Sequence, residues 1–177
     1  MNKTLALMAA ASVVAFAASA NATEYTPYVA ADYTYTDATF EVNGGKIALG
    51  TEYNKYFGTE IFYQRTGSDR VHSQNGTDEF SIQSYGLDAY GYLPLGCDQV
   101  VSLVGTAGIA FDDVKYKFDD GTNRKTEHGL SYRLGAGVEY DVSENVSVRA
   151  LYRYSFTDKI AGLDHMNEYS VGVKYNF

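Results

Sequence analysis

The chain has 177 residues, with 17 Gly, 17 Tyr, two Pro, no Trp and a formal net charge of −8. This length fits one domain. The acidic balance, without any basic run, excludes a nucleic-acid-binding protein. The single cysteine, Cys97, excludes an internal disulfide. Helix signals are nearly absent after residue 22, which favours β structure.

The first 22 residues have the pattern of a secretory signal peptide. Lys3 precedes an apolar run from Leu5 to Ala18, and small-x-small cleavage sites follow at Ala18 to Ala20 and Ala20 to Ala22. The apolar run is too short for a retained transmembrane helix. We expect cleavage after Ala22, leaving one mature domain at 23–177 with no second domain.

Eight segments then alternate between apolar and polar or small residues at every second position. In the last one, Glu-Tyr-Ser-Val-Gly-Val-Lys-Tyr-Asn-Phe, all apolar residues fall on one face of a strand. The expected strands, in chain order, are Tyr25–Tyr35, Lys46–Tyr53, Phe57–Gln64, about Phe80–Leu93, Val100 to about Phe118, Leu130–Asp141, Val146–Thr157 and Glu168–Phe177.

The connections between these strands alternate in length. Those after the second, fourth and sixth strands are short, at Asn54–Tyr56, Pro94–Gln99 and Val142–Asn145, and the others are longer and polar. Short periplasmic turns and long outer loops are typical of transmembrane β-barrels, as is an even strand number. The sequence therefore predicts an all-β, eight-stranded antiparallel up-and-down transmembrane β-barrel.

Alternation alone does not say which face is inside, because a soluble barrel would turn its apolar face inward. The polar face here is rich in Gly, Ala and Ser, as the crowded lumen of eight strands requires, and its charges balance. Tyr and Phe gather at both ends of the apolar faces, as at the two boundaries of a membrane. We therefore expect the apolar face to contact lipid.

The charged residues of the inward face are expected to fill the lumen, because eight strands leave room only for side chains. Arg149 and Arg153 should pair with acidic residues from other strands, drawn from Glu52, Glu60, Asp88 and Glu139. The predicted lumen charge network is Glu52, Glu60, Asp88, Arg133, Glu139, Arg149 and Arg153. A narrow porin-like channel lined by the same charges is the alternative.

Near the outer end of the fifth expected strand, the outward face becomes polar and the inward face becomes apolar, without a change of register. After Phe111 the outward phase continues as Asp113, Lys115 and Lys117. Charges do not sit on a lipid face, so this strand and its neighbour should leave the membrane here. The residues predicted to pack together above the barrel mouth are Phe80, Ile82, Val114, Tyr116 and Phe118.

The signal pattern, the strands and the terminal aromatic together resemble the small eight-stranded outer-membrane barrel family. This family includes the transmembrane domain of outer-membrane protein A and the opacity-type surface barrels. The resemblance marks a C-terminal assembly signal, formed by Tyr169, Val171, Val173, Tyr175 and Phe177.

The resemblance also implies a location and partners. It implies a monomer in the bacterial outer membrane, surrounded by lipid and lipopolysaccharide and inserted by the barrel-assembly machinery. Its role would be structural, or contact with a host or surface ligand through the outer loops. No cofactor and no nucleic acid are expected.

Three histidines, His72, His128 and His165, raise an enzymatic alternative, because some barrels resembling this one modify lipid A with His, Ser and an acid. Ser73, Ser131, Asp164 and Glu168 are the further candidates. His128 and Ser131 are three residues apart, so a strand would point them to opposite faces. We therefore expect no enzyme activity and no metal site.

Overall fold

The computed structural model describes residues 25–37, 41–67, 69–73, 76–117, 124–160 and 163–177. The predicted signal peptide and its cleavage site lie outside these residues. The described residues form antiparallel strands: β1 (Thr26–Asp37), β2 (Glu41–Asn54), β3 (Phe57–Thr66), β4 (Asp69–Ser73), β5 (Gly76–Leu95), β6 (Val101–Lys117), β7 (Arg124–Asp141), β8 (Val146–Ile160) and β9 (Leu163–Asn176).

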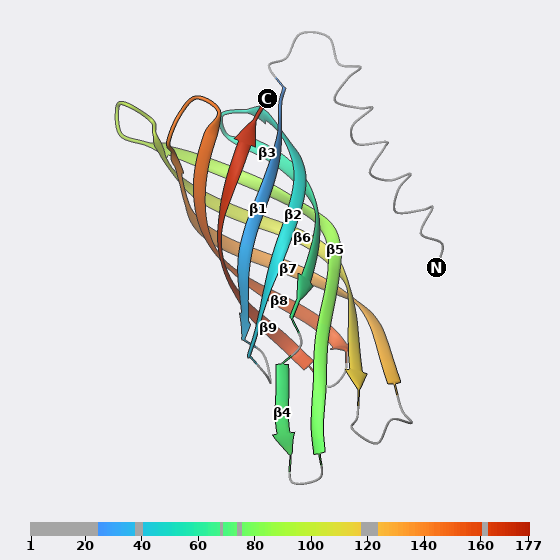
Figure 1. Cartoon of the computed structure of the whole chain (residues 1–177). Helices are drawn as coiled ribbons and strands as arrows, with labels where there is room; N and C mark the ends of the chain where they lie inside the picture. The colour runs from blue at the N-terminus through green and yellow to red at the C-terminus, as the bar shows by residue number, and fades with distance from the viewer. Residues whose placement is uncertain (1–24, 38–40, 68, 74–75, 118–123, 161–162) are drawn as a thin grey trace.

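These strands close into a barrel with eight positions in its wall (Figure 1). Each strand pairs with the next along the chain, and β1 pairs with β9 to complete the ring. β3 and β4 occupy one position, because both pair with β5, through Arg65 opposite Gln83 and then Asp69 opposite Phe80. The predicted eight-stranded antiparallel barrel is therefore confirmed.

The two ends of the barrel differ as the loop lengths predict. The short connections β2–β3, β5–β6 and β7–β8 lie at the same end as the C-terminus, and the β4–β5 hairpin extends from the other end (Figure 1). The β5–β6 turn uses positive φ angles at Gly96 (74°) and Gln99 (52°). Asn54 accepts a hydrogen bond from the backbone N–H of Tyr56 at 2.8 Å and so tightens the β2–β3 turn.

The apolar face of each strand points outward, as expected. Ile47, Leu134 and Val171 are 64%, 54% and 59% exposed, whereas the inward Lys46 and Glu60 are at most 1% exposed. A soluble barrel with an apolar interior is thereby excluded. Within the described residues, no helix is long and apolar enough to cross a membrane.

Aromatic residues lie at both ends of the outward face. At the periplasmic end, Tyr53 packs against Tyr25 and Phe57, with ring centroids 5.4 and 5.7 Å apart. At the outer end, the rings of Tyr152 and Tyr169 are 5.2 Å apart. Both belts follow the prediction.

β5 and β6 continue past the membrane as predicted, whereas β7 begins at Arg124 instead of the predicted Leu130, and β4 was not predicted. β5 and β6 remain paired as far as Glu79 opposite Lys117, well beyond the aromatic belt. The outward face becomes polar here because water replaces lipid, while the alternation continues with Ile82 and Val114 on the inward face.

The apolar residues expected above the barrel mouth are partly described. Ile82 and Val114 face each other in the register and are 3% and 1% exposed. Phe80 and Tyr116 pair through their backbones. Phe118 lies outside the described residues, so the packing of the whole group remains a prediction.

Candidate functional site

The middle of the lumen holds an ion cluster around Arg149 of β8. Its Nε and Nη2 atoms donate to the two carboxylate oxygens of Asp32 at 2.8 and 2.7 Å, and Nη1 donates to Glu60 at 2.7 Å. Lys46 lies 3.1 Å from Asp32. All four side chains are almost fully buried. The forked contact of Arg149 with Asp32 is among the strongest geometries of a charged hydrogen bond.

Glu60 of β3 collects hydrogen bonds from four side chains. In addition to Arg149, it accepts from Lys46 Nζ at 2.9 Å, Tyr90 OH at 3.0 Å and Tyr28 OH at 3.2 Å. An ionised carboxylate has about four acceptor sites, so this buried charge is fully satisfied.

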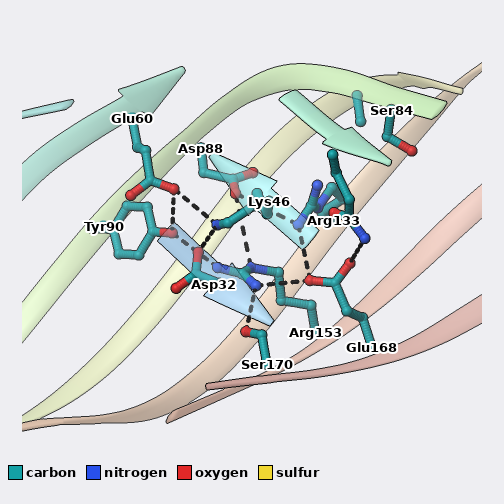
Figure 2. A network of polar contacts seen from close by, with 12 residues as sticks. Asp32, Lys46, Glu60, Ser84, Asp88, Tyr90, Arg133, Arg153, Glu168 and Ser170 are labelled. Carbon is teal, nitrogen blue, oxygen red and sulfur yellow. Dashed lines mark hydrogen bonds and ion pairs between the residues drawn. The ribbon is translucent and has the colours of Figure 1, made fainter. Parts of the chain in front are cut away.

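A second cluster surrounds Arg153, four residues further along β8 (Figure 2). Arg153 Nη1 donates to Glu168 at 2.8 Å and to the Ser170 hydroxyl at 3.0 Å, and Nη2 donates to Tyr90 OH at 2.9 Å. The Tyr90 hydroxyl in turn donates to Glu60. This one side chain therefore connects the two clusters.

Arg133 and Asp88 complete the second cluster. Arg133 Nη2 lies 3.5 Å from Glu168 and 3.7 Å from Asp88. Gln64 Nε2 donates to the other oxygen of Glu168 at 2.7 Å. The guanidinium of Arg133 also lies 4.3 Å from the ring centroid of Phe62, within cation–π distance.

A third cluster lies toward the periplasmic end. Lys174 Nζ donates to both Glu52 and Glu139. The same ammonium lies 5.3 Å from the ring of Tyr28 and 5.2 Å from the ring of Tyr92. Together the three clusters contain every buried charged side chain of the described residues except Asp112.

Inward glycines allow charged side chains of non-adjacent strands to meet. Gly172 of β9 pairs with Asp32 on one side and Arg149 on the other, and these two side chains join above it. A Cβ at Gly172 would lie 1.9 Å from Asp32 Oδ1, and one at Gly108 would lie 2.0 Å from Asp88 Oδ1. Both contacts are too short, so the clusters depend on these glycines.

All seven sequence-predicted lumen residues lie on the inward face, but some partners differ from those expected. Glu60 binds Arg149, and Asp88 lies 3.8 Å from Arg153. Glu52 and Glu139 contact Lys174 rather than an arginine. The closest acidic partners of Arg149 and Arg153 include Asp32 and Glu168, which the expected partner set did not contain.

Sequence reasoning missed the aromatic residues of the lumen. Tyr28, Phe62, Tyr90 and Tyr92 are at most 8% exposed. Their inward direction could have been predicted from the sequence. Each lies an even number of positions from an inward charged residue on its own strand, as Tyr90 does from Asp88. Apolar character alone had favoured the lipid face for such residues.

The two histidines whose side chains the structure describes, His128 and His165, do not form the catalytic arrangement. His128 is exposed and contacts the carboxylate of Asp113, whereas Ser131 is buried on the inward face. His165 is exposed, and its ring stacks on Tyr154 with centroids 5.5 Å apart. The side chains of His72, Ser73 and Asp164 lie outside the described part of the structure.

The residues of the predicted assembly signal share the outward face of β9 and its end. Tyr169, Val171, Val173, Tyr175 and Phe177 are each at least 45% exposed. The backbone N–H of Phe177 donates to the carbonyl of Pro27 at 3.0 Å. This bond fixes the end of the chain against β1.

Comparisons with solved structures agree with this architecture. Neisserial surface protein A is 18% identical, with a TM-score of 0.69 over 86% of this chain and 97% of that chain. Ail of Yersinia pestis, in complex with the heparin analogue sucrose octasulfate, is 18% identical, with a TM-score of 0.56 over the same shares. The N-terminal barrel of Pseudomonas aeruginosa OprF is 18% identical, with a TM-score of 0.53 over 85% of this chain and 97% of that chain.

Sequence comparisons add a family and a cellular location. A curated relative, the 22 kDa outer membrane protein of Rhizobium leguminosarum bv. viciae, is 47% identical over 53 residues, which are 30% of this chain and 24% of the relative. The family model described as outer membrane protein beta-barrel domain matches residues 5–177. The protein is thus located in the bacterial outer membrane, and the chain belongs to the outer membrane protein beta-barrel domain family.

Proposed function

We propose that this chain is a closed, non-conducting monomeric barrel that holds extended strands above the outer membrane for contact with a surface ligand. The observation that carries the proposal is the continuous set of hydrogen-bonded ions across the lumen. Asp32, Lys46, Glu60 and Arg149 come from four different strands and meet at 2.7–3.1 Å.

This arrangement favours a plug over the porin-like alternative. An ion crossing the lumen would have to separate Arg149 from both of its carboxylate partners. Opening such a buried pair leaves charges uncompensated, at a cost of about 3–5 kcal/mol. The Tyr90 hydroxyl would lose its contacts at the same time, because it lies between the two clusters.

Two assays on the same protein test this role against the alternatives. Planar-bilayer conductance of the purified chain should show no discrete channel steps, and lipid A from cells that express it should keep its mass. Regular conductance steps would support the porin-like channel. A mass change in lipid A would support the enzyme.

The extension beyond the membrane supports the surface-ligand part of the proposal. Backbone pairing there continues through Lys117 of β6 opposite both Glu79 of β5 and Arg124 of β7. Neighbouring strands thus bring basic residues of the sequence together at backbone level. With the sulfated ligand of Ail as a chemical precedent, we propose an anionic sugar as the ligand class.

Binding to immobilised heparin tests the ligand class. Proteoliposomes with the wild-type chain should be retained, and the double variant Lys117→Glu/Arg124→Glu should lose most retention at low salt, where such contacts are strongest. Lys55→Glu is the matched control, because Lys55 lies in the periplasmic β2–β3 turn. Equal retention of all three proteins would refute the anionic-sugar proposal and leave the plugged barrel unaffected.

A further inference from the structure

The charged residues of the lumen form groups that differ in how well positive and negative charges match. Arg149 and Lys46 match Asp32 and Glu60, and Arg133 and Arg153 match Asp88 and Glu168. Lys174 faces two carboxylates, of which Glu52 has a side chain 21% exposed to water. One further lumen carboxylate, Asp112 of β6, pairs with no basic residue among the described side chains.

Asp112 is buried as deeply as the paired carboxylates. It is 2% exposed, and its Oδ1 atom accepts a hydrogen bond from the neutral Ser84 hydroxyl. Its Oδ2 atom has no hydrogen-bond partner. Burying an ionised carboxylate without a compensating positive charge is costly, so such a group either takes up a proton or acquires a positive partner.

A second unpartnered oxygen lies in the same part of the lumen. Gln64 is 4% exposed, and its Oε1 atom accepts no hydrogen bond, while its Nε2 atom is held by Glu168. Gln64, Ser84 and Asp112 form one register row across β3, β5 and β6. Ser84, the smallest of the three, lies between the two longer residues in this row.

Gln64 and Asp112 both line a small cavity at the outer end of the lumen. Its volume is about 20 Å³, enough for one water-sized species. Ser84 and Ser131, whose hydroxyl oxygens can serve as further ligands, also line it, together with the apolar Ile82 and Met166. We call this cavity the outer chamber.

We propose that the outer chamber binds one small monovalent cation of about the size of Na⁺ on Asp112 Oδ2 and Gln64 Oε1. Hard cations prefer carboxylate, amide and hydroxyl oxygens. A single charge matches the one uncompensated carboxylate. No group of three or more His, Cys, Asp or Glu that could hold a metal ion occurs among the described residues, which argues against a multivalent ion.

Arg133 also lines the chamber and its charge acts on Asp112 from a distance, but the two form no ion pair. Its charge is shared between Glu168 at 3.5 Å and Asp88 at 3.7 Å, and its guanidinium lies over the ring of Phe62. The bound ion would therefore join β3 to β6 at the base of the extension that leaves the membrane.

Urea unfolding of the refolded full-length chain in detergent micelles tests the proposal. At mildly alkaline pH, where carboxylates are ionised, NaCl is exchanged for N-methylglucamine chloride at constant ionic strength. The wild-type midpoint should rise with Na⁺, and the logarithm of the unfolding constant should change with that of the Na⁺ concentration with a slope near one ion. Asp112→Asn should abolish the difference between the two salts.

Asp37→Asn is the matched control, because it removes the same charge from an exposed position on β1 and should leave the Na⁺ effect intact. If Asp112→Asn does not fold, sodium NMR of the wild-type protein replaces it, with line broadening that Li⁺ but not N-methylglucamine reverses. Equal wild-type midpoints in the two salts would mean that the chamber holds only water or a proton, and would overturn the proposal. A Na⁺ effect that persists in Asp112→Asn would overturn it as well.

Discussion

At the scale of single residues, the Tyr90 hydroxyl bonds to charged groups of two different lumen clusters. It accepts from Arg153 Nη2 at 2.9 Å and donates to Glu60 at 3.0 Å, so it belongs to both inner clusters. Tyr92 lies two residues away on the same inward face, yet its hydroxyl has no hydrogen-bond partner. The two tyrosines therefore differ in bonding while sharing strand, direction and burial.

Tyr90→Phe should lower the free energy of unfolding by about 1–3 kcal/mol, because it removes two hydrogen bonds to charged groups without changing the ring. Tyr92→Phe should change it by less than about 0.5 kcal/mol, since no bond is lost. Urea unfolding of the refolded chains measures both. Equal effects of the two substitutions would show that the Tyr90 hydroxyl does not couple the clusters.

Arg149→Ala should have a larger effect. It leaves Asp32 and Glu60 buried with only Lys46 to compensate them, and breaking a buried pair costs about 3–5 kcal/mol. Arg65→Ala truncates an exposed arginine on β3 and should be nearly neutral. A midpoint for Arg149→Ala within error of that for Arg65→Ala would contradict a structural role of the central cluster.

The sequence predicts which of these residues point inward but not which of them meet. Alternation within β8 is sufficient to place Arg149 and Arg153 in the lumen. The contact of Arg149 with Asp32 joins residues separated by 117 positions and depends on the closing pair β1–β9, on its register and on Gly172. No local sequence pattern carries that information. The predicted ion-pair partners were therefore less accurate than the predicted inward or outward direction of each side chain.

At the scale of elements, the membrane determines where sequence patterns are reliable. Between the aromatic belts, lipid on one side and a packed lumen on the other enforce alternation, and the predicted strands agree with the observed ones within a few residues. Beyond the outer belt, lipid no longer selects apolar residues for the outward face, although Ile82 and Val114 remain buried on the inward face. The sequence therefore underestimated β5 and β7 and missed β4.

Amide hydrogen exchange should show that the β5–β6 extension is ordered above the membrane. Val114 is 1% exposed and pairs with Ile82, so its amide should exchange much more slowly than amides in the exposed turn at Cys97 to Gln99. The measurement is made on the refolded chain in micelles. Exchange throughout Asp113–Lys117 as fast as in that turn would show that the extension is not a stable ribbon.

Phe177→Ala should reduce assembly in cells more than it reduces stability. Phe177 is 69% exposed and packs only edge-on against Tyr175 among the aromatic contacts described, so its truncation removes little packing. If it is read by the assembly machinery, the folded fraction in outer membranes should fall several-fold while refolding in detergent is unchanged. Tyr140→Ala, an exposed aromatic at the same end, is the control, and an equal loss of assembly in both variants would remove the special role of Phe177.

At the scale of the whole molecule, the β1–β9 pairing leaves no open edge in the membrane-spanning part of the wall. The pairing runs from Tyr28 opposite Asn176 to Asp37 opposite Asn167. In lipid or detergent every backbone polar group must be paired within the protein, so a partly opened barrel would expose two unsatisfied edges. Unfolding should therefore be cooperative across the barrel, and the lumen clusters, which join strands on opposite sides of the wall, should strengthen this coupling.

Cooperative unfolding of the barrel should be visible by gel electrophoresis. The unboiled chain in dodecyl sulfate should migrate as a compact band distinct from the boiled chain, and heating should convert one band to the other without intermediates. Arg149→Ala should lower the conversion temperature by several degrees, because a loss of about 3–5 kcal/mol is a large part of the stability of a domain of this size. Arg65→Ala should convert at the wild-type temperature. A gradual shift in mobility, or identical bands before and after boiling, would contradict a closed barrel that the lumen ions stabilise as a unit.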